Sequence, residues 1–304
     1  RPLRTLAVVG PTASGKSTLA LGIARVCGGE IVSVDSMQVY RGMDIGTAKA
    51  SKTMLEEVPH HLIDLVEPEH DVPVAVFQRY GRAALEDIDA RGVTAVICGG
   101  SGLHFRSLID PLDFPPSDED IRSGLEELDA AAARARLEEI DSEAAEHVDL
   151  ANPRRVVRAL EIAAITGMTP SARAATDEAA AIRAYRPVRD VTIVGIDPGE
   201  VLATRVERRF DEMLECGLLE EVAGLQDRMG RLARQAVGYK EMLPVLSGER
   251  NLDDARKDAI AATMALAKRQ RTFFRRDPRI EWITWDPDPQ VRLAAAQRRL
   301  DGGV

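Results

Sequence analysis

The sequence has little cysteine, and the cysteines it has are scattered. Cys27, Cys98 and Cys216 stand alone, and no two of them form a C-x-x-C pair. The sequence therefore predicts neither a cysteine-based zinc site nor a disulfide framework, and this usage is typical of the reducing cytoplasm. Long apolar runs are also missing, and no segment approaches the roughly 20 residues that a membrane-spanning helix needs. We expect a cytoplasmic protein without a membrane partner.

The sequence has fewer basic than acidic residues, but many of the basic residues lie in three clusters. The 40 Lys and Arg residues are outnumbered by 49 Asp and Glu residues, which gives a formal net charge of −9. A negative total argues against nucleic acid as a partner, although local clusters can reverse that argument. The clusters are Arg154, Arg155 and Arg158; Arg205, Arg208 and Arg209; and Lys268, Arg269, Arg271, Arg275 and Arg276. One such cluster is typical of a solvated helix face, but three in an acidic protein predict a polarised surface that can contact a phosphate backbone.

The pattern of hydrophobic residues predicts an α/β fold. With 304 residues, of which 45% are hydrophobic, the chain can form one large or two ordinary domains. Strand-like runs occur at residues 6–9, 30–34, 95–98 and 191–196, and helical segments lie between them. This alternation indicates a P-loop parallel sheet wound by helices.

A long helical segment interrupts this alternation. The pattern breaks at the prolines of residues 111–116, and Ser117-Asp-Glu-Asp120 then predicts the cap of a run that stays helical to about Thr166. No strand candidate occurs there, and alternation resumes only near residue 190. The sequence therefore predicts an α/β core over residues 1–114 and 189–304, with an all-helical insertion over residues 115–188.

A second long helix is predicted after this insertion. Asp197-Pro198 reads as an N-cap and first-turn pair. The helix after it would carry Leu202, Val206, Phe210 and Leu214 on one apolar stripe. Arg205 and Arg209 would share another face of the same helix.

The strongest motif is GPTASGKS, which lies between a predicted strand and a predicted helix. In that context G-x-x-x-x-G-K-[ST] indicates a phosphate-binding loop, because backbone N–H groups and the helix N-terminus converge on an oxyanion. Lys16 would add a point charge, and the Ser17 hydroxyl can ligate Mg²⁺. The binding residues are predicted as Gly10, Thr12, Ala13, Ser14, Gly15, Lys16 and Ser17. The loop alone does not say whose phosphates it holds.

The acid that ATPases of the Walker type require is missing from its usual place. The predicted strand over residues 95–98 runs into Gly99-Gly-Ser-Gly102 instead of an Asp. The nearest carboxylate at a strand end is Asp35, which makes it a candidate general base beside the phosphates, with a turn or helix cap as the alternative. His60 and His61 are adjacent and would point apart on a strand, so we expect a structural or substrate-packing role and no metal.

Seven segments, in order over nearly the whole chain, together resemble the tRNA dimethylallyltransferases of the bacterial type. The segments are GPTASGKS from Gly10; Asp35-Ser-Met-Gln-Val-Tyr-Arg-Gly-Met-Asp-Ile-Gly-Thr-Ala-Lys49; Pro59-His-His-Leu-Ile-Asp64; Gly99-Gly-Ser-Gly-Leu103; Asn152-Pro-Arg-Arg-Val-Val-Arg-Ala-Leu-Glu161; Ala236-Val-Gly-Tyr-Lys-Glu241; and Ala267-Lys-Arg-Gln-Arg-Thr272. Members of that family move a prenyl group from dimethylallyl diphosphate to the exocyclic amine of the adenosine 3′ of certain tRNA anticodons. The resemblance implies that the loop holds an isoprenoid diphosphate, which leaves as inorganic diphosphate.

The resemblance also implies roles for individual residues. Thr12, Lys16 and Arg209 would hold the diphosphate, Ser17 would ligate Mg²⁺, and Asp35 would take the proton from the adenine amine, so Asp35, Thr12 and Arg209 are the implied catalytic residues. Residues implied to bind tRNA are Asp35, Ser36, Met37, Gln38, Ser101, Arg154, Arg155, Arg158, Lys240, Lys268 and Arg271. The helical insertion would lie against the anticodon stem, and the partners would be tRNA and dimethylallyl diphosphate, bound by a monomer.

The sequence departs from the family pattern in three places. Ser101 and His104 stand where Thr and Tyr are usual, and Phe273 stands where Trp is common.

Three other functions would explain part of the same sequence evidence. A small-molecule kinase would explain the phosphate loop and Asp35, a non-catalytic RNA-binding P-loop protein would explain the basic clusters, and a prenyltransferase of free adenine nucleotides would explain the loop and the base. The insertion and the basic clusters favour RNA as the acceptor.

Overall fold

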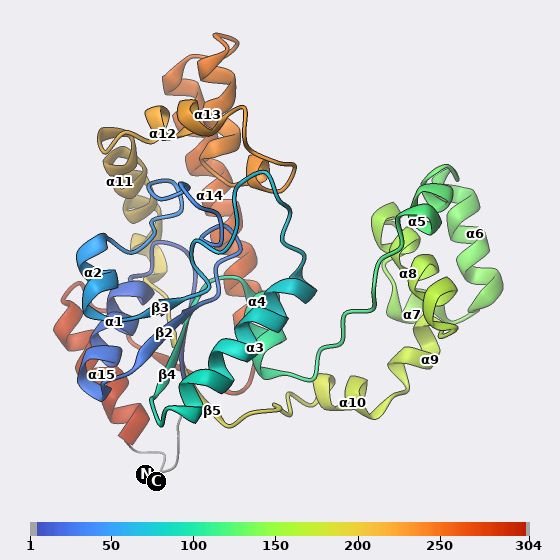
Figure 1. Cartoon of the computed structure of the whole chain (residues 1–304), viewed down its shortest axis with the longest axis horizontal. Helices are drawn as coiled ribbons and strands as arrows, with labels where there is room; N and C mark the ends of the chain where they lie inside the picture. Colours follow the sequence, from blue (N-terminus) through green and yellow to red (C-terminus); the bar gives the residue numbers. More distant parts are fainter. Residues whose placement is uncertain (1–4, 302–304) are drawn as a thin grey trace. The chain divides into compact units, whose positions relative to one another are not determined.

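A computed structural model describes residues 5–301 of the chain and divides it into two compact units (Figure 1). One unit contains the residues up to Ile109 and from Arg189 onward, and the other is Asp110–Val188. The sequence predicts the insertion over residues 115–188, so the helical unit begins five residues earlier than predicted, at Asp110. The predicted ends of the core at residues 1 and 304 lie outside the described residues.

The first unit is built on a parallel sheet, as the sequence predicts. Its strands are β1 (Thr5–Val9), β2 (Glu30–Ser33), β3 (His60–His61), β4 (Ala95–Gly99), β5 (Val191–Ile196) and β6 (Ile280–Ile283). Their order is β3-β2-β4-β1-β5-β6, and every neighbouring pair is parallel. The α/β prediction is confirmed. The sequence did not identify β3 and β6, which are the two short edge strands.

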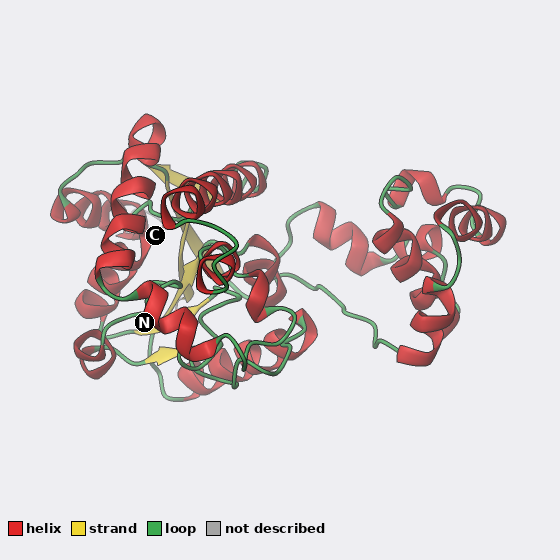
Figure 2. Cartoon of the chain, turned by 90° about the horizontal axis from the view of Figure 1, so that it is seen from above, coloured by secondary structure: helices red, strands yellow, loops and turns green. Residues whose placement is uncertain are grey.

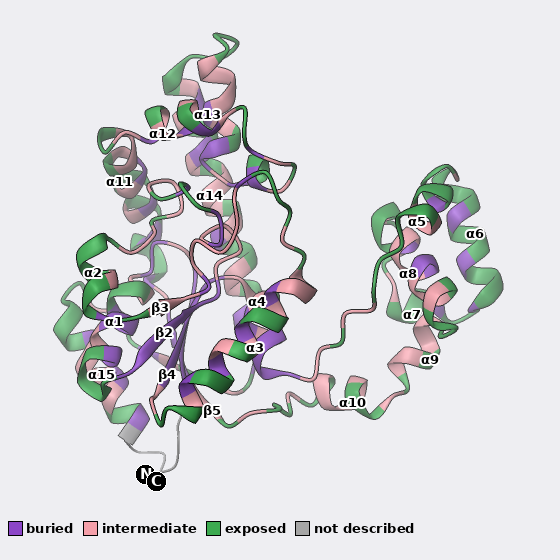
Figure 3. Cartoon of the chain, viewed as in Figure 1, coloured by how far each residue is buried: buried purple, intermediate pink, exposed green. Residues whose placement is uncertain are grey.

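The strands are hydrophobic on both faces because helices cover both faces (Figures 2 and 3). Alternate residues of one strand enter different clusters, so that Ala7 and Val9 pack with α3, whereas Leu6 and Val8 pack with α1. A sheet buried in this way presents its strand ends, and the loops that follow them, as the accessible surface for a ligand.

The helices of the first unit account for most of its remaining residues. They are α1 (Lys16–Cys27), α2 (Lys52–Glu57), α3 (Val74–Ala90), α4 (Gly102–Ile109), α11 (Leu202–Glu215), α12 (Leu218–Leu225), α13 (Tyr239–Leu246), α14 (Leu252–Phe274) and α15 (Pro289–Asp301), with short 3₁₀ turns at Gly199–Val201 and Ala233–Gln235. Within the described part of the chain, no helix combines the length and the apolar character that crossing a membrane requires.

The predicted start of α11 is wrong. Asp197 does not cap this helix, which begins at Leu202 after a 3₁₀ turn and has Val201 at its N-cap position. The Asp197 carboxylate instead accepts hydrogen bonds from the Gly199 N–H and from the Arg271 guanidinium. The predicted apolar stripe is present, since Leu202, Val206 and Phe210 are buried.

The second unit is all-helical over its described residues. It contains α5 (Glu119–Glu126), α6 (Ala130–Ile140), α7 (Ala144–His147), α8 (Pro153–Thr166), α9 (Pro170–Ala174) and α10 (Asp177–Arg183). The Asp118 side chain caps α5, and the Asn152 side chain caps α8 ahead of a first-turn proline. Leu125, Leu137 and Leu160 form the centre of its small core. The unit therefore has a hydrophobic core of its own.

Candidate functional site

The phosphate loop follows β1 and has the backbone geometry that its glycines allow. Gly10 has φ 154°, and a Cβ at this position would lie 2.1 Å from the Ile196 carbonyl oxygen, so a side chain cannot fit. Ala13 and Gly15 have positive φ values of 59° and 89°, and α1 begins directly at Lys16. The loop therefore turns its N–H groups inward at the N-terminus of a buried helix, where an anion is stabilised.

Two cations from distant parts of the chain meet at this loop. The Lys16 ammonium donates to the Pro11 carbonyl at 3.2 Å, and Nη1 of Arg209 on α11 donates to the Thr12 hydroxyl at 3.3 Å. Burial lowers the pKa of Lys16, and burial likewise lowers the pKa of Arg209. Both charges have lost part of their hydration, so a bound anion would stabilise them strongly.

Asp35 lies beyond the end of β2 and faces the same cations. Its Oδ1 accepts the Met37 N–H at 2.9 Å, which holds the carboxylate in an Asx turn. Within residues 5–301, Oδ2 has no hydrogen-bond partner. One oxygen thus fixes the carboxylate while the other remains available to accept a proton.

Two adjoining chambers meet at these residues. The larger has a volume of about 350 Å³ and is lined by Lys16, Ser17 and Thr18 of the phosphate loop. The smaller, of about 110 Å³, is lined largely by apolar side chains. These are Met37, Val206, Phe210, Met213, Ala236, Val237 and Leu266. Thr12, Asp35, Thr47, Arg209 and Leu266 line both chambers. The arrangement can bring a phosphorylated molecule and a second reactant to one carboxylate.

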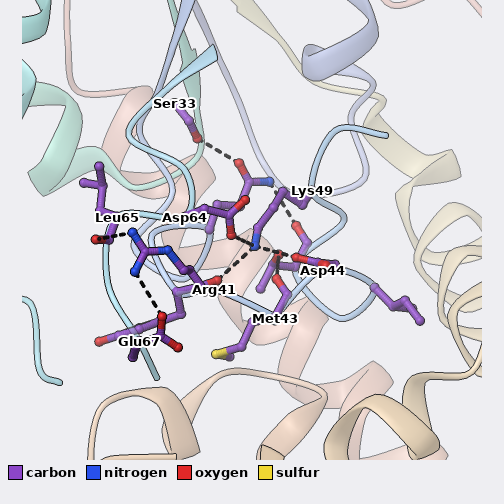
Figure 4. A network of polar contacts seen from close by, with 12 residues as sticks. Ser33, Arg41, Met43, Asp44, Lys49, Asp64, Leu65 and Glu67 are labelled. Atoms are coloured by element: carbon purple, nitrogen blue, oxygen red, sulfur yellow. Dashed lines mark hydrogen bonds and ion pairs between the residues drawn. The ribbon is translucent and has the colours of Figure 1, made fainter. Parts of the chain in front are cut away.

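The loop after Asp35 is held by a buried lysine that the sequence did not single out. Only 3% of the Lys49 side chain is exposed, and its ammonium donates to the Tyr40 carbonyl at 2.9 Å and to Asp44 and Asp64 at 2.6 Å each (Figure 4). Charge-assisted hydrogen bonds of this kind are strong. These hydrogen bonds hold the loop after Asp35 in place, including Thr47, which lines both chambers.

Gln38 is oriented by the same loop. Its Oε1 accepts from the Ser33 hydroxyl at 2.8 Å, and its Nε2 donates to the Thr47 carbonyl at 3.1 Å. The Glu221 carboxylate on α12 supports the loop from the other side by accepting the N–H groups of Asp44, Ile45 and Gly46, and the Tyr239 hydroxyl also donates to it. The amide of Gln38 is thereby fixed before any ligand binds.

The remaining candidate residues divide into exposed and paired groups. Arg154, Arg155, Lys240 and Lys268 are exposed, and Ser36 and Met37 are half-buried. Ser101 is half-buried, and its hydroxyl lies 2.7 Å from Nδ1 of His104. Arg155 also approaches Asp149 to 3.6 Å, whereas Arg154, Lys240 and Lys268 make no ion pair among the described residues.

Two of the predicted tRNA-binding arginines are engaged inside the protein. Arg271 makes a bidentate contact with Asp197, with its Nη2 at 2.6 Å from Oδ1 and its Nε at 2.8 Å from Oδ2. Arg158 donates to the fully buried Glu161 at 2.6 Å and to the Pro115 carbonyl at 2.6 Å. Each guanidinium shares a carboxylate with a second arginine, which is Arg122 at Glu161 and Arg275 at Asp197. Arg158 and Arg271 therefore have a structural role whether or not they also reach RNA.

The paired histidines do not form a metal site. His60 contacts the Val58 carbonyl through Nδ1 at 2.7 Å, and His61 contacts Glu30 through Nε2 at 2.7 Å. The described residues contain no group of three His, Cys, Asp or Glu side chains placed to hold a metal ion. These hydrogen bonds account for a structural role of both histidines, and His60 also lines the larger chamber.

Sequence reasoning missed Gln270, which contacts the phosphate loop directly. Its Oε1 accepts the Thr12 N–H at 2.7 Å, across a separation of 258 residues. It lies in the basic stretch on α14, between Lys268 and Arg271, where nothing in the spacing marks it as different. A contact of such long range depends on how α14 packs, which a local pattern does not reveal.

Comparison with family models identifies two overlapping matches. The model described as IPP transferase matches residues 38–277, and the model described as isopentenyl transferase matches residues 3–65. Among curated proteins, the tRNA dimethylallyltransferase of Streptomyces coelicolor is 42% identical over 289 residues, covering 92% of this chain and 90% of that protein. The tRNA dimethylallyltransferase of a Nocardioides species is 44% identical over 317 aligned positions and covers 99% of both chains.

Solved structures agree with these matches. The full-length tRNA isopentenylpyrophosphate transferase from Bacillus halodurans superimposes with a TM-score of 0.73 at 35% identity, covering 98% of this chain and 96% of that one. A eukaryotic dimethylallyltransferase acting on tRNA gives a TM-score of 0.79 at 25% identity, covering 99% of this chain and 80% of that one. The similarity extends over both units of the chain.

Proposed function

This chain belongs to the IPP transferase family, and on that premise we propose that it is a tRNA dimethylallyltransferase. It transfers a dimethylallyl group from dimethylallyl diphosphate to the exocyclic amine of the adenosine 3′ of the anticodon, and inorganic diphosphate leaves. The resemblance in the sequence motifs implies the same activity.

One observation carries this proposal. Thr12, Asp35 and Arg209 line both the chamber of the phosphate loop and the adjoining apolar chamber. A diphosphate on the loop would thus place the allylic carbon of its prenyl group within reach of a carboxylate, at a point open to a second reactant. Proximity of this kind supplies a large part of enzymatic rate enhancement.

The chemistry assigns a step to each of these residues. The bond between the allylic carbon and the diphosphate oxygen breaks, a bond forms from that carbon to the amine nitrogen, and the amine proton goes to Asp35. Negative charge grows on the departing diphosphate. Lys16, Arg209 and the loop N–H groups stabilise this charge, and they gain most in the transition state because they are already desolvated.

The absence of a strand-end acid fits this reaction. β4 ends at Gly99 and continues into Gly100 and Ser101, so no carboxylate is available there to order a hydrolytic water. Mg²⁺ commonly takes one or two protein ligands together with phosphate oxygens and water, which fits the exposed Ser17 hydroxyl beside the larger chamber. The ion would neutralise the charge on the leaving group.

The acceptor base must leave its stack to reach Asp35. Extruding a base costs a few kcal/mol and is cheapest in a single-stranded loop, which favours the anticodon loop over a helical stem. Ser36, Met37 and the preset amide of Gln38 would hold the extruded adenine. RNA phosphates would be contacted by the exposed Arg154, Arg155, Lys240 and Lys268. Ser101 would also contact the tRNA, and so would Arg158 and Arg271 while they keep their ion pairs.

We further propose that the enzyme acts as a monomer, in the cytoplasm with its tRNA.

The activity is tested by mass spectrometry of nucleosides from tRNA incubated with the enzyme, Mg²⁺ and dimethylallyl diphosphate. We expect a prenylated adenosine, located by nuclease mapping to the position 3′ of the anticodon. Free AMP offered in place of tRNA serves as the control. If AMP is prenylated efficiently and tRNA is not prenylated at all, the acceptor is a free nucleotide, which would contradict the proposal.

The exposed basic residues are tested through the salt dependence of tRNA binding. Arg154→Ala and Lys268→Ala each remove a charge with no ion-pair partner among the described residues. We expect each variant to bind tRNA more weakly and to reduce the slope of log affinity against log salt by about 0.7 to 1, because one counterion fewer is released. Filter binding at several salt concentrations measures the slope.

Arg158→Ala and Arg271→Ala are the matched comparison. Each removes the closer of two arginines that pair with one carboxylate, since Glu161 keeps Arg122 and Asp197 keeps Arg275. We therefore expect a loss of about 1 to 3 kcal/mol in the free energy of unfolding. Thermal and denaturant unfolding measure this loss. If the Arg154 and Lys268 variants keep the slope of the unaltered protein, the RNA does not contact these two positions.

A further inference from the structure

Three side chains from elements far apart in the sequence form a stack behind the phosphate loop. Trp285 follows β6, and the Arg205 guanidinium of α11 lies 5.1 Å from the centre of its ring system. The guanidinium of Arg292 on α15 lies 5.7 Å from the same centre. Guanidinium groups over an indole are held by cation–π attraction. The stack therefore joins α11, the segment after β6 and the C-terminal helix.

Each member of the stack contacts one of three consecutive loop residues. Arg205 donates through Nε to the Ala13 carbonyl at 2.7 Å, and Trp285 donates through Nε1 to the Ser14 carbonyl at 3.0 Å. Arg292 packs against Gly15, where a Cβ would lie 3.3 Å from its Nη2. Two of these three loop residues, Ala13 and Gly15, have positive φ values.

Unsatisfied polar groups gather at the same place. Among the residues that the structure describes, the buried side-chain polar atoms without a hydrogen-bond partner are Ser14 Oγ and Arg292 Nε. Arg292 is only 4% exposed and donates to the Asp286 carbonyl at 2.8 Å. Such groups are uncommon in a native structure, so two of them beside the same loop require an explanation.

Carboxylates compensate the two guanidiniums only in part, because burial lowers the pKa of Arg292 although Asp286 and Asp288 act to raise it. Within residues 5–301 neither makes an ion pair with a carboxylate. Burial lowers the pKa of Arg205, and the neighbouring Arg292 lowers it further. Neither residue lines a chamber of the site, so neither would touch the donor. Their charges act on the loop from behind and would be stabilised by an anion in front of it.

We propose that Arg205, Trp285 and Arg292 form a clamp that positions the phosphate loop. The two guanidiniums of this clamp also supply positive potential at the loop before a diphosphate binds. The ligand class rests on the proposed function, in which the loop holds an isoprenoid diphosphate. The clamp fixes the carbonyls of Ala13 and Ser14, so the N–H groups of the loop keep their inward direction without a ligand. The C-terminal helix α15 therefore contributes to donor binding through residues that never contact the donor.

The clamp is tested with inorganic diphosphate as the ligand. We expect Arg205→Met and Arg292→Met each to weaken diphosphate binding by about tenfold, since each removes one partly or fully buried cation near the loop. The affinity for tRNA should not change. Arg208→Met on α11 and Arg298→Met on α15 are matched controls, because both side chains are exposed. Isothermal titration calorimetry gives the affinities.

A fluorescence measurement separates positioning from general loss of structure. The chain has two tryptophans, so Trp282→Phe leaves Trp285 as the single reporter. We expect diphosphate to change the Trp285 emission in this background, and Arg292→Met to weaken the concentration dependence of that change by the same factor as in calorimetry. Trp285→Phe keeps a ring for stacking but removes the hydrogen bond to Ser14, and it should weaken diphosphate binding as well.

The possible outcomes distinguish this inference from the proposed function. If the unaltered protein binds diphosphate and the three clamp variants bind it equally well, the clamp is wrong while the proposed function stands. If the unaltered protein binds no diphosphate, both are wrong. A clamp variant that fails to fold would not decide the matter for its own residue, so the decision then rests on Trp285→Phe, which preserves both cations and the stacked ring.

Discussion

Asp35→Asn should lower the rate of prenyl transfer by about 10²-fold or more, because the amide cannot accept the amine proton. The substitution preserves the Asx turn, since the amide oxygen can still accept the Met37 N–H that Oδ1 accepts now. The geometry of the loop should therefore survive. The affinity for tRNA and for inorganic diphosphate should change little.

Single-turnover measurements with saturating donor and tRNA give this rate directly. Asp227→Asn is a suitable control, because Asp227 is exposed and lies outside both chambers. A rate close to that of the unaltered protein would remove Asp35 from the proton transfer. Loss of tRNA binding without loss of rate would assign it to base recognition alone.

Arg209→Met should slow the chemical step by about 10²- to 10³-fold, comparable to the loss of one donor at a site where charge develops. Arg209 is half-buried and contacts the Thr12 hydroxyl at 3.3 Å, so in the proposed reaction its charge would face the departing diphosphate. Charge on that group grows as the carbon–oxygen bond breaks. The effect on rate should thus exceed the effect on donor binding. We expect Lys16→Met to behave in the same way.

The control for Arg209→Met is its neighbour Arg208. Arg208 is exposed and forms a surface ion pair with Glu212 at 3.2 Å, so Arg208→Met should leave the rate unchanged. Single-turnover rates compared with donor dissociation constants separate the two effects. A loss confined to tRNA affinity in Arg209→Met would place this side chain against the RNA.

The sequence predicted the architecture well where local patterns determine it. Four strands contain runs of apolar residues long enough to mark them, although β2 also includes Glu30 and Ser33. Prolines followed by a helix-capping sequence mark the beginning of the insertion. The edge strand β3 has only His60 and His61, and β6 includes Glu281 and Trp282, so neither shows a hydrophobic run. Their pairing depends on the neighbouring strand, which no local pattern contains.

The candidate site was predicted in part. The motif spacing predicted a phosphate loop and Asp35 as site residues, and the resemblance added Arg209. The structure brings these residues together around one chamber, with Arg209 against Thr12. The contacts of Arg205, Gln270 and Trp285 with the loop were not foreseen, because they join residues far apart in the chain. Their positions follow from the packing of α11, α14 and the segment after β6.

The basic clusters show a different limit of sequence reasoning. Arg154 and Arg158 are four residues apart on α8, yet the first is exposed while the second pairs with the buried Glu161. Likewise, Lys268 is exposed on α14, whereas Arg271 pairs with Asp197, the residue that the sequence predicts as a helix cap. A count of positive charges cannot separate these cases. The partner of each cation is set by tertiary structure.

The central claim is that the phosphate loop holds an isoprenoid diphosphate and not ATP, and release of inorganic diphosphate tests it most directly. The unaltered enzyme is mixed with Mg²⁺ and with tRNA, dimethylallyl diphosphate or ATP, singly and in pairs, and released diphosphate and phosphate are measured. We predict diphosphate release only when tRNA and dimethylallyl diphosphate are both present, in amounts equal to the prenylated adenosine formed. Turnover of ATP that depends on tRNA, with dimethylallyl diphosphate left intact, would contradict the account.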